Sequence, residues 1–159
     1  MRVAVLFIAV CAASSVWAQE TCTVYGVSDG DTVKVRCSQG KQVTIRLSGI
    51  DAPEKKQPFG QRSKQNLSAL VFSKLVTVET KKLDRYGREI GKILVDGVDA
   101  NLMQVQRGFA WHYKAYEREQ PAIDRKVYAD AENEARAARR GLWADVEPVP
   151  PWEFRHKKK

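Results

Sequence analysis

Alternating apolar and polar residues predict strands over much of the first hundred residues. Five segments have this pattern: 23–27, 32–36, 41–47, 75–83 and 88–95. The first two flank Ser28-Asp29-Gly30-Asp31, where Asp-Gly is a typical turn of a tight hairpin. Asp84-Arg85-Tyr86-Gly87 interrupts the last two segments in the same way. The pattern therefore predicts two groups of antiparallel strands.

Apolar residues at helical spacing, together with stop signals, predict three helices near 59–73, 100–107 and 121–139. Pro121 suits a first helical turn and Gly141 a helix end. The prolines of residues 48–58 predict a loop. The order is three strands, a helix, two strands and two helices. An α+β fold, a five-stranded, partly open Greek-key barrel with helices at one side, satisfies this order, although the pattern alone does not exclude sandwich topologies.

The N-terminus has the composition of a targeting segment. Arg2 precedes an apolar run over residues 3–10, and Val16-Trp17-Ala18 offers small residues at the −3 and −1 positions of a cleavage site. The alternative is a buried element of the mature fold. We expect a signal peptide over residues 1–18, one domain over residues 19–146 and an extended, partly disordered tail over residues 147–159. Export to a periplasm or to the medium, with no membrane anchor, follows from this interpretation.

The chain is basic, with 27 lysines and arginines against 19 aspartates and glutamates and a formal net charge of +8. Removal of residues 1–18 takes away only Arg2 and leaves +7. A basic exported protein binds nucleic acid, anionic lipid or acidic polysaccharide through the same electrostatic attraction. The charge therefore supports a polyanionic partner without identifying it.

Two cysteines, Cys22 and Cys37, remain after residues 1–18 are removed. They lie symmetrically about Asp29-Gly30, so the predicted hairpin places them opposite each other. An exported protein with such a pair is expected to form a disulfide. Free or metal-bound thiols are the alternative, but the chain has no further cysteines with which to build a zinc site.

Three polar clusters carry candidate chemistry. Asp29 and Asp31 place two carboxylates at a tight turn, where oxygen ligands for calcium or magnesium are often found. Arg46 is followed by Asp51 and Glu54, which are three residues apart and can serve one bound water. The third cluster is the turn 84–88, which can aim an arginine at a phosphate. Each cluster alone is more typical of a turn or a solvated loop than of a catalytic site.

Together, the three clusters resemble the thermonuclease family, the micrococcal or staphylococcal nuclease-like domain. The matching segments are Asp29-Gly30-Asp31-Thr32-Val33, Arg46-Leu47-Ser48-Gly49-Ile50-Asp51-Ala52-Pro53-Glu54, Asp84-Arg85-Tyr86-Gly87-Arg88 and Gln106-Arg107-Gly108-Phe109-Ala110. The resemblance covers residues 22–143 and implies an oligonucleotide-binding (OB) barrel with three helices. It also implies a single Ca²⁺ held by Asp31, Asp51 and the carbonyl of Ala52. The family often has threonine at the last position, and the alanine here removes a hydroxyl contact but keeps the carbonyl.

The same resemblance assigns roles to the remaining residues. Glu54 is implied as the general base, and Arg46 and Arg88 as the groups that bind phosphate and stabilise the transition state. Tyr86 and Tyr113 are similar to the aromatics that border the nucleotide pocket. Asp29 is implied to strengthen the negative field without direct ligation.

These features predict a secreted, monomeric, calcium-dependent nuclease that hydrolyses DNA and RNA with low sequence specificity. The resemblance implies cleavage of the P–O5′ bond to leave 3′-phosphate ends. A non-catalytic OB-fold module that only binds nucleic acid is the main alternative. A surface protein that binds envelope polyanions explains the charge but not the three clusters. A metal-free ribonuclease needs a histidine pair, and His112 and His156 are the only two histidines.

Overall fold

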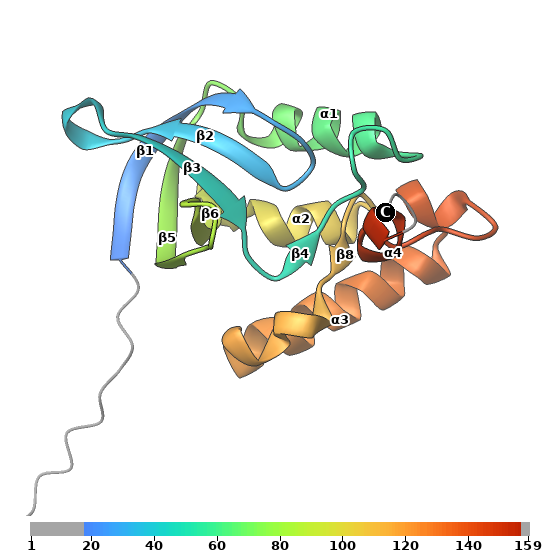
Figure 1. Ribbon diagram of the computed structural model, residues 1–159. Coiled ribbons are helices and arrows are strands. Elements are labelled where there is room, and N and C mark those ends of the chain that lie inside the picture. Colours follow the sequence, from blue (N-terminus) through green and yellow to red (C-terminus); the bar gives the residue numbers. More distant parts are fainter. Residues whose placement is uncertain (1–17, 157–159) are drawn as a thin grey trace, which may run out of the picture.

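The computed structural model describes residues 18–156. The pairings of five strands close a barrel, and Figure 1 shows how these strands are arranged. The strands of the main sheet are β1 (Ala18–Val27), β2 (Thr32–Arg36), β3 (Gln42–Leu47), β5 (Leu75–Leu83), β6 (Glu89–Val95) and β7 (Val98–Asp99). Their order is β3-β2-β1-β5-β6-β7. A parallel pairing of β3 with β6, in which Arg46 is opposite Ile90, closes β1, β2, β3, β6 and β5 into the barrel.

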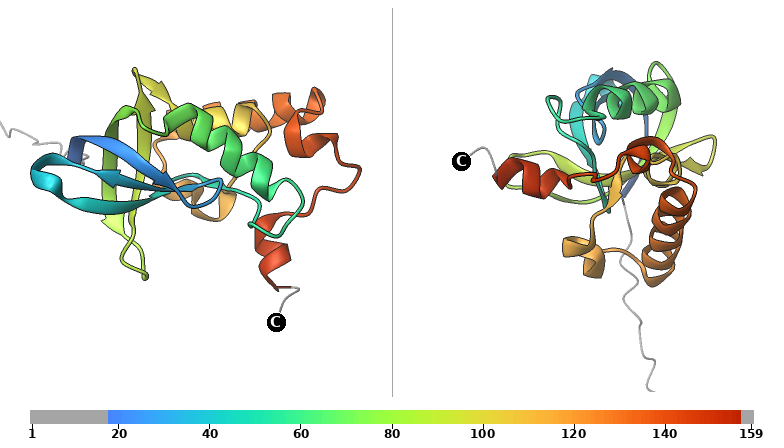
Figure 2. Two further views of the ribbon diagram at one scale, coloured as in Figure 1. Left: turned by 90° about the horizontal axis from the view of Figure 1, so that it is seen from above. Right: turned by 90° about the vertical axis from the view of Figure 1, so that its right-hand side faces the viewer.

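Helices gather at one side of the barrel (Figures 1 and 2). They are α1 (Gly60–Val71), α2 (Ala100–Gln106), α3 (Ala122–Ala137) and α4 (Pro151–His156), with 3₁₀ turns η1 (Ser38–Gly40), η2 (Lys114–Glu119) and η3 (Gly141–Ala144). A second small sheet joins β4 (Ile50–Asp51) to β8 (Trp111–His112). Among the described residues, no helix has the length and apolar character that crossing a membrane requires.

The core residues follow the same apolar periodicities from which the strands and helices were predicted. Val33 and Val35 on β2 are fully buried while Lys34 between them is exposed, because alternate strand residues point to opposite faces. On α1, Leu67 and Val71 are four residues apart, lie on one helix face and join the same core cluster. A second cluster of Trp111, Ala135, Leu142 and Trp143 lies between β8, α3 and η3.

The structure confirms the predicted fold class and places the predicted strands and helices with end shifts of a few residues. The largest shift is in β1, which begins at Ala18 and pairs with β5 as far as Ala18 opposite Thr80. The prediction of an extended, partly disordered tail is wrong for residues 151–156, which form α4. Packing of Trp152 against Trp111 and Tyr113 gives this short helix its stability. The predicted signal peptide, apart from Ala18, and Lys157–Lys159 lie outside the described residues.

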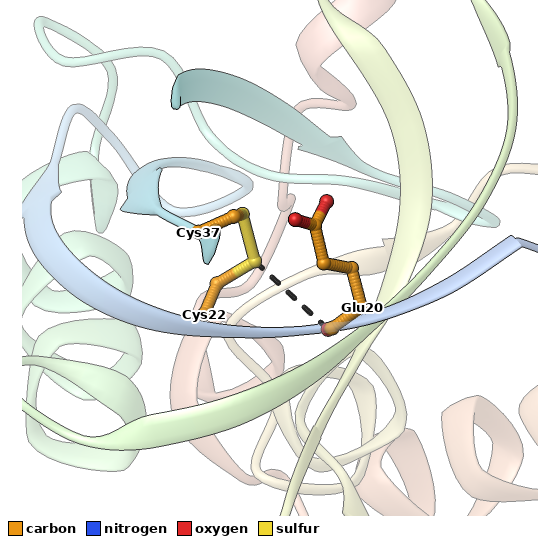
Figure 3. Close-up of side chains that lie close together, drawn as sticks. All are labelled: Glu20, Cys22 and Cys37. Carbon is orange, nitrogen blue, oxygen red and sulfur yellow. Dashed lines mark hydrogen bonds between the residues drawn. A yellow bond between two sulfur atoms is a disulfide. The ribbon is translucent and has the colours of Figure 1, made fainter. Parts of the chain in front are cut away.

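The predicted disulfide is confirmed, with Cys22 and Cys37 bonded and their Cα atoms 4.1 Å apart (Figure 3). The register of β1 and β2 explains this bond, because Thr23 and Arg36 form the last pair of the ladder and the cysteines are the next residues beyond it. The carboxylate of Glu20 lies beside the two sulfurs, but sulfurs joined in a disulfide are not thiolate ligands for a metal. An open pocket of about 360 Å³ adjoins this bond, and no predicted catalytic or metal-binding residue lines it.

Candidate active site

Asp31 lies at the end of the β1–β2 turn and is held there by its neighbours. Its backbone N–H donates to Asp29 Oδ1 over 3.2 Å, and its carbonyl accepts from the N–H of Leu47 over 2.8 Å. Thr32 donates its hydroxyl to Asp31 Oδ1 over 3.1 Å. The Asp31 side chain is therefore fixed against the end of β3, and the residue is only 6 % exposed.

Asp51 is brought to the same place by the small sheet of β4 and β8. It pairs through its backbone with Trp111, and Ile50 pairs with His112. Buried Glu132 of α3 accepts the N–H of His112 over 3.1 Å and so ties β8 to the helices. The next residue of the chain, Ala52, donates its N–H to Asp31 Oδ2 over 2.7 Å. The two carboxylates predicted as metal ligands thus lie side by side.

Arg46 on β3 bridges these carboxylates. Its Nη2 lies 3.2 Å from Asp31 Oδ2 and 3.0 Å from Asp51 Oδ1. Its Nη1 donates to the carbonyls of Leu47 and Ile50 over 2.9 and 3.0 Å. The guanidinium fork is therefore fixed at both ends, a geometry that a lysine ammonium does not reproduce.

The electrostatics of Asp31 show that negative charge is concentrated here. Burial is the largest cause that raises its pKa, and the charges of Asp29 and Asp51 raise it further. The Arg46 guanidinium and the Ala52 N–H act in the opposite direction, and the pKa of Asp31 is raised from 3.8 to about 7. A cation that binds both carboxylates would relieve this cost of burial and repulsion. Closely spaced carboxylate oxygens are the donors that hard divalent cations prefer, so the residues fit such an ion.

Glu54 lies in the loop after β4, and its carboxylate is paired with a residue from the far end of the chain. Arg155 Nη1 donates to Glu54 Oε1 over 2.9 Å. The same guanidinium contacts both oxygens of Asp51, with Nη2 2.7 Å from Oδ2 and Nη1 3.2 Å from Oδ1. The hydrogen bond to Asp51 is the main cause that raises the pKa of Arg155. Arg155 thus joins the predicted metal ligand to the predicted base.

Tyr113 lies next to this cluster, immediately after β8. Its N–H donates to the carbonyl of Gly49 over 2.9 Å. Burial raises the pKa of its phenol, and the charge of Asp51 raises it further. Trp152 of α4 stacks on the ring, with 5.6 Å between centroids and 27° between planes. Tyr113 is therefore placed where an aromatic border of the candidate site is expected.

Arg88 and Tyr86 lie apart from the carboxylates, on the turn between β5 and β6. Arg88 Nε is 2.7 Å from Asp84 Oδ2, and its guanidinium lies 5.5 Å from the centroid of the Tyr86 ring. Within residues 18–156, no hydrogen bond or ion pair joins Arg88 to Asp51 or Glu54. Tyr86 is 69 % exposed. The structure thus brings Asp31, Ala52, Arg46, Asp51, Glu54 and Tyr113 together and leaves Arg88 and Tyr86 on a neighbouring turn.

The two histidines give no support to a metal-free ribonuclease. His112 is buried in β8, and its Nε2 lies 2.9 Å from Gln120 Oε1. His156 is exposed at the end of α4. In the part of the chain that the structure describes, no contact joins the two imidazoles.

Sequence reasoning missed the contribution of the C-terminal segment to this site. Arg155 contacts the carboxylates, and Trp152 stacks on Tyr113. Gln57, in the loop after β4, donates its side-chain N–H to the carbonyl of Val149. The available signal was Trp152 and Arg155 three residues apart, which places both side chains on one face of a helical turn.

Comparisons with known proteins identify the family of this chain. The profile of the family described as staphylococcal nuclease homologue matches residues 44–145. An uncharacterized endonuclease of Escherichia coli O157:H7 is 46% identical over 136 residues, 85% of this chain and 84% of the relative. An uncharacterized endonuclease of Haemophilus influenzae is 40% identical over 141 residues, 89% of this chain and 76% of the relative. A micrococcal nuclease of Shigella flexneri is 36% identical over 152 residues, 90% of this chain and 84% of the relative. The chain therefore belongs to the staphylococcal nuclease homologue family.

Proposed function

We propose that this protein is an exported, calcium-dependent endonuclease that hydrolyses phosphodiester bonds of DNA and RNA with low sequence specificity. The endonuclease and micrococcal nuclease names of its relatives support the reaction class. The Cys22–Cys37 disulfide supports export, because such bonds persist in oxidising compartments. Proposed products carry 3′-phosphate ends, and the proposed working form is a monomer.

The single observation that carries this proposal is the contact of Arg46 with both Asp31 and Asp51. These residues come from β3, the β1–β2 turn and β4. Arg46 Nη2 lies within 3.2 Å of both carboxylates, and Asp51 is 1 % exposed. Two buried acids held this close provide a cation site, and the guanidinium beside them provides a phosphate contact. Glu54 adds a half-exposed carboxylate that water can reach, with 42 % of its side chain exposed.

In the proposed mechanism, Asp31, Asp51 and the carbonyl of Ala52 would hold Ca²⁺. The ion supplies Lewis acidity and offsets phosphate charge when bound. Glu54 orients the attacking water and accepts its proton. The water oxygen bonds to phosphorus as the P–O5′ bond breaks, and the 5′-oxygen leaves as a hydroxyl with a proton from solvent. Arg46 binds a non-bridging phosphate oxygen and stabilises the additional negative charge of the pentacoordinate transition state.

Two groups complete the proposed substrate contacts. Arg88, on the neighbouring turn, binds the same phosphate group once its pairing with Asp84 gives way to the substrate. Tyr113 and Tyr86 border the nucleotide, and an exposed ring such as Tyr86 offers a surface on which an unstacked base can lie. Single strands and breathing duplexes are therefore the preferred substrates of the proposed site.

The proposal is tested by incubating the protein with denatured DNA and with RNA, in Ca²⁺, in other divalent cations and in excess chelator. Degradation that requires Ca²⁺ and leaves 3′-phosphate ends is the expected result. A non-catalytic OB-fold nucleic-acid-binding module is the second candidate. Salt-sensitive binding without cleavage in any of these cations would establish it and would refute the nuclease assignment.

A further inference from the structure

The C-terminal helix α4 contributes to the candidate active site, although it lies outside the segment that the family profile matches. That match ends at residue 145, and α4 covers Pro151–His156. Pro151 is buried, and Trp152 packs edge-on against Trp111 with ring centroids 5.5 Å apart. Gln57 binds the carbonyl of Val149 and attaches the segment to the loop that carries Glu54. Figures 1 and 2 show α4 beside this loop.

Arg155 is the residue of α4 that meets the charged groups. Its guanidinium makes three hydrogen bonds, two to Asp51 and one to Glu54, over 2.7, 3.2 and 2.9 Å. Within the described residues, the Glu54 carboxylate has no other hydrogen-bond or ion-pair partner. The orientation of Glu54 relative to Asp51 is thus set by Arg155.

The two oxygens of Asp51 are used differently. Oδ1 faces Asp31, because Arg46 Nη2 bridges it to Asp31 Oδ2. Arg155 contacts both oxygens, with its shorter bond to Oδ2 over 2.7 Å and a longer one to Oδ1 over 3.2 Å. A cation held by Asp31 and by Asp51 Oδ1 would compete with the longer contact of Arg155, and the shorter bonds of Arg155 to Oδ2 and to Glu54 would remain. This geometry favours support of the site over blockage of the cation.

We propose that Arg155 is a positioning residue for the nuclease reaction, which holds Glu54 and Asp51 in fixed mutual orientation and makes α4 part of the active site. This inference rests on the proposed function. A base must be placed within hydrogen-bond reach of its water, and a displacement of about 1 Å costs about a hundredfold in rate. Arg155 acts through the two carboxylates.

The test compares the unaltered protein with Arg155→Ala and with Arg139→Ala, which removes the same charge from an exposed site after α3. Near-ultraviolet circular dichroism of the tryptophans first establishes that each variant is folded. Arg155→Ala is expected to lower kcat at saturating Ca²⁺ by about ten- to a hundredfold and to change KM for denatured DNA by less than about threefold. Arg139→Ala is expected to change neither.

Two further measurements separate positioning from simple structural support. Added methylguanidinium is expected to restore part of the kcat of Arg155→Ala, because it replaces the missing guanidinium group. It is expected to leave the kcat of Arg139→Ala unaffected. Trp152→Ala is expected to lower kcat as well, because it loosens the helix that carries Arg155. Combining it with Arg155→Ala is expected to add little, since both changes weaken the contact of Arg155 with Asp51 and Glu54.

Three outcomes would overturn the inference. Unchanged kcat would show that Glu54 and Asp51 need no support from Arg155. Tighter Ca²⁺ binding by calorimetry together with a raised kcat/KM at limiting Ca²⁺ would show that Arg155 competes with the cation. A raised KM alone would make it a substrate contact. An unaltered protein that cleaves nothing would instead refute the proposed function, so the two failures are distinguishable.

Discussion

Gly30 separates Asp29 from Asp31, and its missing side chain lets two loops of the candidate site touch. A Cβ placed on Gly30 would lie 2.7 Å from the Ala52 Cβ and 2.8 Å from the Ser63 Cβ, and closer still to the Ser63 Oγ. Ser63 is fully buried and donates to the carbonyl of Phe109 over 2.6 Å, so it cannot turn away freely. Gly30→Ala therefore forces the turn of Asp31 away from Ala52.

The expected cost follows from these contacts. Overpacking of a buried site costs about 1–3 kcal/mol, and the loss of glycine flexibility in the unfolded chain returns about 0.4–1 kcal/mol. The net destabilisation of Gly30→Ala is thus about 1–2 kcal/mol, or about 3–8 °C in the midpoint of thermal unfolding for a domain of this size. Because Ala52 is displaced from Asp31, calcium affinity measured by calorimetry is also expected to fall.

A matched control is available in Gly26 on β1. A Cβ placed there would meet Lys34 at 3.5 Å, an ordinary contact, so Gly26→Ala is expected to leave stability within about 1 kcal/mol. Adding Ser63→Ala to Gly30→Ala removes the nearest clashing atom. The double variant is expected to lose less stability than the two single variants together. Equal unfolding midpoints for Gly30→Ala and Gly26→Ala, with additive double-variant effects, would refute the reasoning.

Three further predictions concern charge, the disulfide and the phosphate contact. In chelator, the unfolding midpoint of the unaltered protein should fall relative to Asp31→Asn as pH rises from about 4 to about 7. The pKa of Asp31 is raised from 3.8 to about 7 on folding, so the stabilisation that its protonation provides is fully present below pH 3.8 and is lost as pH rises through about 7. A difference in unfolding midpoint between the two proteins that does not change with pH would contradict this cause. Replacing Cys22 and Cys37 by alanine should cost about 3 kcal/mol in chemical denaturation, since the bond closes a loop with a sequence separation of 15; a loss under about 1 kcal/mol would show that the hairpin is ordered without it. Arg46→Lys should lower kcat at least about a hundredfold, because the fork contacts both carboxylates and two carbonyls; a loss under about threefold in single-turnover cleavage would remove Arg46 from the transition state.

Local patterns were sufficient to predict most of the fold. The alternation in β2, the Asp29-Gly30 turn and the apolar stripe of α1 are properties of neighbouring residues, and the structure has all three. The pairing of Cys22 with Cys37 followed from the same hairpin register. The carboxylate cluster of Asp31 and Asp51 was predicted through the family resemblance, because separate turns do not reveal that they meet.

The contribution of α4 was not predictable by the same means. Residues 147–151 hold three prolines, and a helix of six residues is not stable by itself, so no local pattern predicts it. Its order comes from contacts with Trp111 and Tyr113, which lie some forty residues earlier in the chain. The placement of Arg88 is a similar case, because its pairing with Asp84 is local and does not fix its distance from Asp51.

The measurement that tests the proposed mechanism most directly is single-turnover cleavage of denatured DNA in Ca²⁺ by the unaltered protein, Glu54→Gln and Glu153→Gln. Glu153 is an exposed acid on α4, so its variant carries the same substitution outside the carboxylate cluster. The mechanism predicts a loss of at least about a hundredfold for Glu54→Gln, because a positioned base contributes about 10²–10⁴ in rate, and no loss for Glu153→Gln. Equal rates for the two variants would contradict the role of Glu54 and, with it, the proposed chemistry of this site.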